Sequence, residues 1–222
     1  MMSSMYIPAS FGENRPAQLQ ALIAAHPLGM LVCAGSGGLI ASPLPFLLYP
    51  DEGPQGTLRA HMARANPHWR EFVQGGECLV LFQGRQGYVT PNWYPGKAAT
   101  HRAVPTWNYA VVQVRGQARS VEDAAWLQRQ LADLTASQEG RRATPWSLAD
   151  APPDYLVAQM QAIVGIEIAI AAIEGKSKLS QNRDAADRAG VVKGLRAADD
   201  AHRNPALAEA VENAAPATAL DK

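Results

Sequence analysis

The chain has 222 residues, a length that fits one large domain or one domain with a small appendage. Hydrophobic residues make up 47%, enough for a sizeable core, and 20 Lys and Arg residues balance 20 Asp and Glu residues. The formal net charge of zero gives no general sign of a nucleic-acid or acidic-membrane partner, although a local basic patch remains open.

The first residues, up to Pro16, lack a basic region followed by an apolar one, so they do not resemble a signal peptide. The most apolar later stretch, 164–173, is too short to cross a membrane and contains Glu167. These features predict a cytoplasmic protein. Cys33 and Cys78 each lie in an apolar run, which indicates buried free thiols rather than a disulfide framework.

The predicted elements begin with a helix over 16–26, which has an apolar stripe on one side. Two strands, 29–34 and 39–49, follow as a hairpin across the GSGG turn. Pro43 and Pro45 interrupt the second strand and predict an edge position, a bulge or backbone left free for another group. Further strands are expected at 55–62, 78–84 and 86–91, with a short helix within 63–72.

The second half begins with a Pro- and Gly-rich loop over 91–106, followed by a strand over 108–121 with alternating apolar and polar residues. Helices are expected at 122–139 and 152–163, a last strand at 166–179, and helical structure from there to about residue 212. The strands are mostly hairpin-linked and βαβ alternation is absent. The pattern favours a mixed α+β fold, a small antiparallel barrel of six or seven strands with peripheral helices.

The common catalytic motifs are missing from the sequence. It contains no GxxxxGK[ST] phosphate loop, GxGxxG, GxSxG or HExxH motif and no paired CxxC, so no metal site is predicted. His61 and His68 would be weakly supported as metal ligands. Any function must therefore rest on less familiar polar segments.

The segment RAHMARANPHW at 59–69 places two arginines, two histidines and Asn66 at the end of a strand and the start of a helix. The segment is compatible both with an anion-binding site and with a solvated polar connector. Between Cys78 and Val121 the chain has five basic residues and no acidic one, together with several Trp and Tyr residues. That combination favours a flat anionic ligand such as a flavin, a haem or a nucleotide base over ordinary core aromatics.

The segment GKSKLSQNR at 175–183 crowds lysines and amides at the end of the last strand. Lys176 and Lys178 share one strand face, and Ser180 suits a helix cap. The amides of this segment suit the edge of a heterocycle, but the segment is also compatible with a plain strand-to-helix turn.

Five segments resemble the PaiB-type family, the FMN-binding negative transcriptional regulators. They are YIPASF at 6–11, HMARANPHW at 61–69, YVTPNWYP at 88–95, VPTWNYAVVQVRG at 104–116 and GKSKLSQNR at 175–183. They occur in the family's order, and the resemblance covers about residues 5–200. The last twenty or so residues lie outside it.

The resemblance implies a split β-barrel related to pyridoxamine-phosphate oxidases and small flavin reductases. It also implies a homodimer with FMN at the subunit interface. By resemblance, His61, Arg64 and Asn66 would face the FMN phosphate, and Ser42, Pro43 and Leu44 would offer backbone groups to the flavin ring. The remaining implied site residues, some of which the other subunit would supply, are Trp107, Asn108, Lys176, Lys178, Gln181 and Asn182. The expected division is a barrel domain over 1–180, a helical extension over 181–212 and a frayed tail over 213–222.

Three functions follow from the resemblance. The first is an FMN-binding negative transcriptional regulator. The second is a flavin-dependent oxidoreductase or a haem-handling enzyme, because FMN itself carries redox chemistry and needs no protein motif. The third is a flavin store, or a homologue without cofactor. DNA binding remains open: the stretch 184–200 has a helix–Gly–helix pattern, but peripheral helices are commoner and repression can act through a partner.

Overall fold

The computed structural model describes residues 5–215, which divide into two compact units. Unit 1 comprises the chain up to Leu19, residues 83–112 and the chain from Glu174 onward. Unit 2 comprises residues 20–82 and 113–173. Three long strands contribute residues to both units: β6 (Gly76–Val89), β7 (Thr106–Val121) and β8 (Ile163–Lys178). The two units are described separately below.

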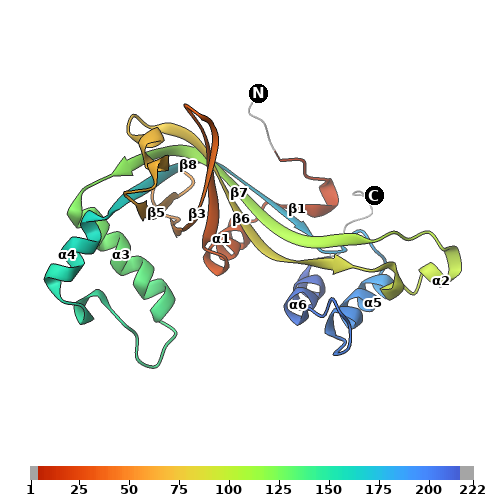
Figure 1. Cartoon of the computed structure of the whole chain (residues 1–222). Helices are drawn as coiled ribbons and strands as arrows, with labels where there is room; N and C mark the ends of the chain where they lie inside the picture. Colours follow the sequence, from red (N-terminus) through yellow and green to blue (C-terminus); the bar gives the residue numbers. More distant parts are fainter. Residues whose placement is uncertain (1–4, 216–222) are drawn as a thin grey trace. The chain divides into compact units, whose positions relative to one another are not determined.

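The strands form an eight-stranded sheet in the order β3-β2-β6-β7-β8-β5-β4, with β1 pairing with β8 off this path (Figure 1). The shorter strands are β1 (Gly12–Glu13), β2 (Leu28–Gly35), β3 (Gly38–Pro45), β4 (Leu47–Tyr49) and β5 (Thr57–Ala63). The pairings of β1 with β8, β2 with β3 and β6, and β5 with β4 and β8 are all antiparallel. The path does not close from β3 to β4, although β3 approaches β5. The predicted class of a split antiparallel barrel is confirmed, but with eight strands instead of the predicted six or seven, because the short strands β1 and β4 were not expected as separate elements.

The strands of unit 2 bury alternate side chains, as strand geometry requires. Leu31 and Cys33 of β2 and Leu58 and Ala60 of β5 point into this core, as does Ile166 of β8. The helices of unit 2 are the 3-10 helices η2 (Pro67–Phe72) and η4 (Leu148–Asp150), α3 (Ala124–Glu139), α4 (Pro153–Gln161) and most of α1 (Pro16–Ala25). The Asp123 side chain caps α3 by accepting from the Trp126 backbone N–H.

Unit 1 has its own apolar core, in which α5 (Ala185–Arg196) packs against α6 (Pro205–Asn213). Val89, Tyr94, Leu179, Val191, Leu195, Leu207, Ala208 and Val211 form this core. The shorter elements are η1 (Ala9–Phe11), η3 (Pro91–Trp93) and α2 (Lys97–Thr100). A methyl group on Gly190 would lie 2.0 Å from the Trp93 carbonyl oxygen, so glycine allows α5 to approach η3 closely.

Most predicted elements are present with small shifts of boundary. Pro43 lies in β3, which ends the sheet path as its prolines predicted, and the predicted strand 39–49 divides into β3 and β4. The two strands predicted over 78–84 and 86–91 are one strand, β6, and the loop predicted over 91–106 contains η3 and α2. Cys33 and Cys78 are buried, as expected. The extension predicted over 181–212 lies in unit 1, whereas the last seven residues of the predicted tail lie outside the described residues.

No helix within residues 5–215 combines the length and the apolar character that crossing a membrane requires.

Candidate functional site

In unit 2, the start of η2 is joined to β3 by side-chain hydrogen bonds. The Asn66 side chain caps η2 by accepting from the His68 backbone N–H at 3.1 Å, and its amide Nδ2 donates to Ser42 Oγ at 3.2 Å. Ser42 and Leu44 are buried, whereas Pro43 between them is exposed. Two of the predicted groups, the β3 residues and Asn66, are therefore brought together.

His68 is a further member of this cluster that the sequence resemblance did not assign to the site. Its ring is fully buried, with Nδ1 at 2.9 Å from Ser42 Oγ and Nε2 at 3.1 Å from Cys33 Sγ. Burial lowers the pKa of His68, against a smaller opposing effect of Glu71, and the ring is accordingly neutral at pH 7. Burial also raises the pKa of Cys33, so its sulfur is a thiol rather than a thiolate.

Arg64, a predicted phosphate ligand, has its guanidinium engaged within unit 2. Nη1 pairs with Glu122 at 2.5 Å, Nε donates to the Gln161 carbonyl at 2.9 Å and Nη2 donates to the Ile163 carbonyl at 3.1 Å. These contacts fix the turn after β5 to the beginning of β8. A phosphate at Arg64 would have to replace them and would meet the charge of Glu122.

Arg70 offers a contrasting guanidinium on η2. It is exposed and lies over the ring of Trp69, 5.4 Å from its centroid. None of the ion pairs within the part of the chain that the structure describes involves Arg70. A cation held on an aromatic face but without a counter-ion suits an anionic ligand.

The predicted residue His61 lies on the other face of β5 from the buried Ala60 and Met62. Its Nδ1 lies 2.9 Å from Oε1 of Gln130, a buried residue of α3. The Nε2 atom of the Gln130 side-chain amide is buried without a hydrogen-bond partner. His61 therefore faces α3. It points away from the core side of β5, whereas Ser42 and His68 are both buried in the core.

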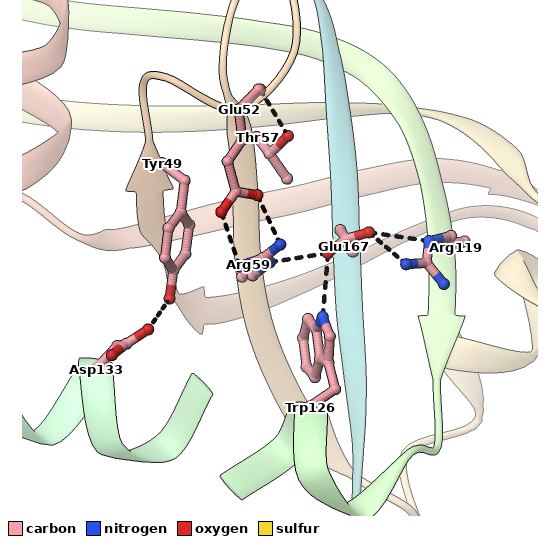
Figure 2. A network of polar contacts seen from close by, with 8 residues as sticks. All are labelled: Tyr49, Glu52, Thr57, Arg59, Arg119, Trp126, Asp133 and Glu167. Atoms are coloured by element: carbon pink, nitrogen blue, oxygen red, sulfur yellow. Dashed lines mark hydrogen bonds and ion pairs between the residues drawn. The ribbon is translucent and has the colours of Figure 1, made fainter. Parts of the chain in front are cut away.

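A polar network on the same face of β5 holds α3 to the sheet. Figure 2 shows Arg59 between Glu52 and Glu167, with Arg119 and the Trp126 indole also directed at the Glu167 carboxylate. Burial alone would raise the pKa of Glu167, but hydrogen bonds from Arg59, Trp126 and Arg119 outweigh it and lower that pKa. The positive and negative groups neutralise one another, which indicates a structural role.

Unit 1 contains the other predicted site residues. Trp107 is 52% exposed and meets Tyr88 edge to face at 6.4 Å between ring centroids. The Lys178 ammonium donates to the Trp107 carbonyl at 2.7 Å and also to the Thr106 hydroxyl. Burial, with the nearby charges of Lys176 and Arg183, lowers the pKa of Lys178.

Lys176 lies on the same strand of unit 1 as Lys178, two residues before it. Its ammonium donates to the Tyr6 carbonyl at 3.0 Å and lies 5.4 Å and 5.6 Å from the ring centroids of Tyr6 and Tyr109. Arg183 lies over the Tyr94 ring at 4.6 Å. The rings of Tyr94 and Tyr109 belong to the aromatic stretch between Cys78 and Val121, but the cations beside them come from the segment 175–183 rather than from the five basic residues of that stretch.

The predicted amides of unit 1 are mostly engaged internally. Asn108 is buried, and its Nδ2 donates to Ser180 Oγ at 2.9 Å. Gln181 accepts from the Leu179 N–H and donates to the Ser177 carbonyl, so its side chain stabilises the turn after β8. Asn182 is exposed. Of these three amides, Asn182 is the one whose side chain faces solvent for a ligand.

Among the described residues there is no group of three or more His, Cys, Asp or Glu side chains that could hold a metal ion. His61 and His68, weighed above as metal ligands, instead contact Gln130 in one case and Ser42 with Cys33 in the other. The candidate ligand-binding groups are cations and aromatic rings in each unit and, in unit 2, the backbone of the edge strand β3.

A family model described as "Putative FMN-binding domain" matches residues 5–172. The chain is 36% identical over 226 residues to an uncharacterized protein from Emericella nidulans, a match that covers 86% of this chain and 90% of that protein. It is 31% identical over 191 residues to "Protease synthase and sporulation protein PAI 2" from Bacillus subtilis, covering 86% of this chain and 89% of that protein.

Two solved structures share the fold. The FAD and heme binding protein from Mycobacterium smegmatis superposes with a TM-score of 0.55 at 18% identity and covers 75% of this chain and 73% of its own. The flavocytochrome Anf3 from Azotobacter vinelandii superposes with a TM-score of 0.52 at 16% identity, and the match covers 75% of this chain and 68% of Anf3. At these identities the likeness concerns the fold alone.

Proposed function

Because this chain belongs to the PaiB-type family of FMN-binding domains, we propose that it is a flavin-dependent negative regulator of transcription, a cytoplasmic homodimer with FMN at the subunit interface. The observation that carries the proposal is the family match over residues 5–172. When bound, FMN supplies one- or two-electron redox chemistry, and the protein supplies binding and orientation.

The phosphate of FMN carries about −1.5 to −2 charges near pH 7, so its site needs uncommitted donors. Arg70 meets this requirement better than Arg64, because Arg64 is already paired with Glu122 and two carbonyl groups. Asn66 is a weaker candidate, because its side chain caps η2 and its backbone N–H donates to the Ala63 carbonyl. We therefore place the phosphate beside η2, with Arg70 as its main partner and His61 at most a peripheral one.

The flavin ring needs a flat surface and hydrogen-bonding groups along its edge. In unit 2, β3 pairs with β2 along one edge and ends the sheet path, so the backbone at Ser42, Pro43 and Leu44 suits the ring edge. In unit 1, Trp107, Lys176, Lys178 and the exposed Asn182 combine an aromatic face with cations and an amide. By the family resemblance, the second subunit of the proposed dimer would supply such residues to the flavin site.

Sedimentation velocity tests the dimer and the flavin together. The proposal expects flavin absorbance to sediment with a species of twice the chain mass. Flavin that sediments with a monomer would contradict the interface site, whereas a dimer that sediments without flavin would contradict flavin binding.

The regulatory role needs its own test, because the helices that could contact DNA carry few free charges. Arg196 of α5 pairs with Glu212 of α6 at 2.6 Å, and Arg188 donates to two carbonyl groups at the end of α6. Fluorescence anisotropy with a labelled duplex, from the promoter region of the protein's own gene, would detect direct binding. Affinity that falls steeply with salt supports contact with DNA phosphates. No binding with or without FMN would contradict direct repression.

A further inference from the structure

A single buried ring connects three segments of unit 2. His68 on η2 is 0% exposed and reaches Ser42 on β3 through Nδ1 and Cys33 on β2 through Nε2. Ser42 and Cys33 lie on neighbouring strands, although Leu31 rather than Cys33 is the register partner of Ser42. The ring thus spans two strands and the helix that follows β5.

A second link reinforces the first. Asn66 donates to the same Ser42 hydroxyl oxygen at 3.2 Å and accepts from the backbone N–H of His68 at 3.1 Å. The cap of η2, the His68 ring and the β3 hydroxyl therefore form a closed cycle of hydrogen bonds. Such a cycle restrains β3 relative to η2 more strongly than either contact alone.

The chemistry of the partners suits a neutral imidazole. A neutral ring has one N–H donor and one acceptor nitrogen, and a hydroxyl and a thiol can each donate or accept. Both ring nitrogens are satisfied in either tautomer. A leucine of similar size would fill the space but would leave the buried Ser42 hydroxyl with one partner fewer, which costs free energy.

We infer that His68 is a positioning residue of the flavin site, which fixes the β3 backbone at Ser42–Leu44 relative to Arg70 on η2. Arg70 follows His68 by two residues, and Pro43 follows Ser42 directly. The cycle therefore sets the spacing between the strand assigned to the ring edge and the cation assigned to the phosphate. This inference rests on the proposed function, but His68 itself touches neither part of FMN.

The test compares His68→Leu with His68→Gln, because the glutamine amide can both donate and accept where leucine cannot. We expect His68→Leu to raise the Kd for FMN by about tenfold, the effect of losing one buried hydrogen bond. His68→Gln should restore most of the affinity and the absorbance spectrum of the bound flavin. Equal affinity and equal spectra for wild type and His68→Leu would overturn the inference.

Hydrogen–deuterium exchange of the flavin-free protein gives a readout that does not depend on FMN. His68→Leu should increase exchange in residues 38–46 and 66–72 but leave α5 and α6 unchanged, and His68→Gln should reverse the increase. Unchanged exchange in both segments would contradict positioning. If wild type binds no FMN, the proposed function fails, whereas this exchange comparison still decides whether His68 fixes β3 to η2.

Ser42→Ala provides a second route if His68→Leu does not fold. It removes the hydroxyl that His68 and Asn66 share and leaves both of those side chains in place. The same increase of exchange in residues 38–46 supports the cycle, and wild-type exchange in that segment contradicts it.

Discussion

Arg64 and Arg70 lie six residues apart, yet their surroundings predict opposite effects on flavin binding. Arg70→Ala should raise the Kd for FMN by about 10- to 100-fold, since a charge-assisted contact with phosphate contributes about 1.5–3 kcal/mol. The Kd for riboflavin, which lacks the phosphate, should not change. Fluorescence titration with both flavins measures the difference.

Arg64→Ala is the matched control for Arg70→Ala. In the wild-type protein, the Arg64 guanidinium is paired with Glu122 and with the carbonyl groups of residues 161 and 163. We therefore expect Arg64→Ala to have lower thermal stability but a nearly unchanged preference for FMN over riboflavin. A lost FMN preference in Arg64→Ala, with Arg70→Ala unaffected, would reverse the assignment.

The sequence identified the segment that contains these residues but not their roles. The Asn–Pro pair at 66–67 predicts the start of a helix, and the structure has η2 there. Arg64 is paired with Glu122, 58 residues away, and the ring of His68 contacts Ser42 and Cys33, 26 and 35 residues away. Local patterns carry no information about such distant partners, so the functional weight of each polar side chain could not be read from the sequence.

At the scale of elements, Glu167 joins β8 to β5, β7 and α3 (Figure 2). Glu167→Gln should destabilise the protein at pH 7 by about 1–3 kcal/mol, because Arg59 and Arg119 then lose a shared counter-ion. Urea denaturation measures this loss.

The pH dependence of that loss has a definite sign. The folded-state pKa of Glu167 is lowered, so its contribution is complete above the ordinary pKa of 4.5 and disappears as pH falls through the lower folded-state value. The difference in the free energy of unfolding between wild type and Glu167→Gln should therefore decrease at pH values below about 4.5. A constant difference in stability between pH 7 and pH 3 would contradict the role of the Glu167 charge.

Gly190 tests the packing of α5 against η3. The new methyl group of Gly190→Ala would lie 2.0 Å from the Trp93 carbonyl oxygen, a backbone atom that cannot rotate away. We expect a loss of about 1–3 kcal/mol, seen as a lower thermal midpoint. Gly37→Ala is the control, since nothing lies within 4 Å of its added carbon. Equal midpoints for both variants would show that η3 can move.

Strand β6 explains where element prediction from the sequence was incomplete. The glycines of QGRQG at 83–87 indicated a tight turn between two strands, but β6 continues through them. β6 runs without a break from Gly76 to Val89, and a methyl group on Gly87 would lie 2.8 Å from a Leu207 side-chain carbon. Glycine there makes room for α6, a requirement that the sequence alone does not distinguish from a turn.

At the scale of the whole molecule, the fold class, the family and FMN as its cofactor were predictable from the sequence. Hairpin-linked alternating runs indicated an antiparallel sheet, and motif order indicated the family, which the match over residues 5–172 confirms. The division into two units was not predictable, because it cuts across β6, β7 and β8, and hydrophobic periodicity continues through each of those strands. Dimerisation and repression stay proposals that depend on surfaces beyond one chain.

Fluorescence titration of FMN with the purified protein tests the central claim most directly. We predict saturable quenching with one FMN per chain, and weaker binding of riboflavin because it lacks the phosphate. Failure of FMN to bind saturably, under conditions where circular dichroism shows a folded protein, would contradict flavin binding by this chain.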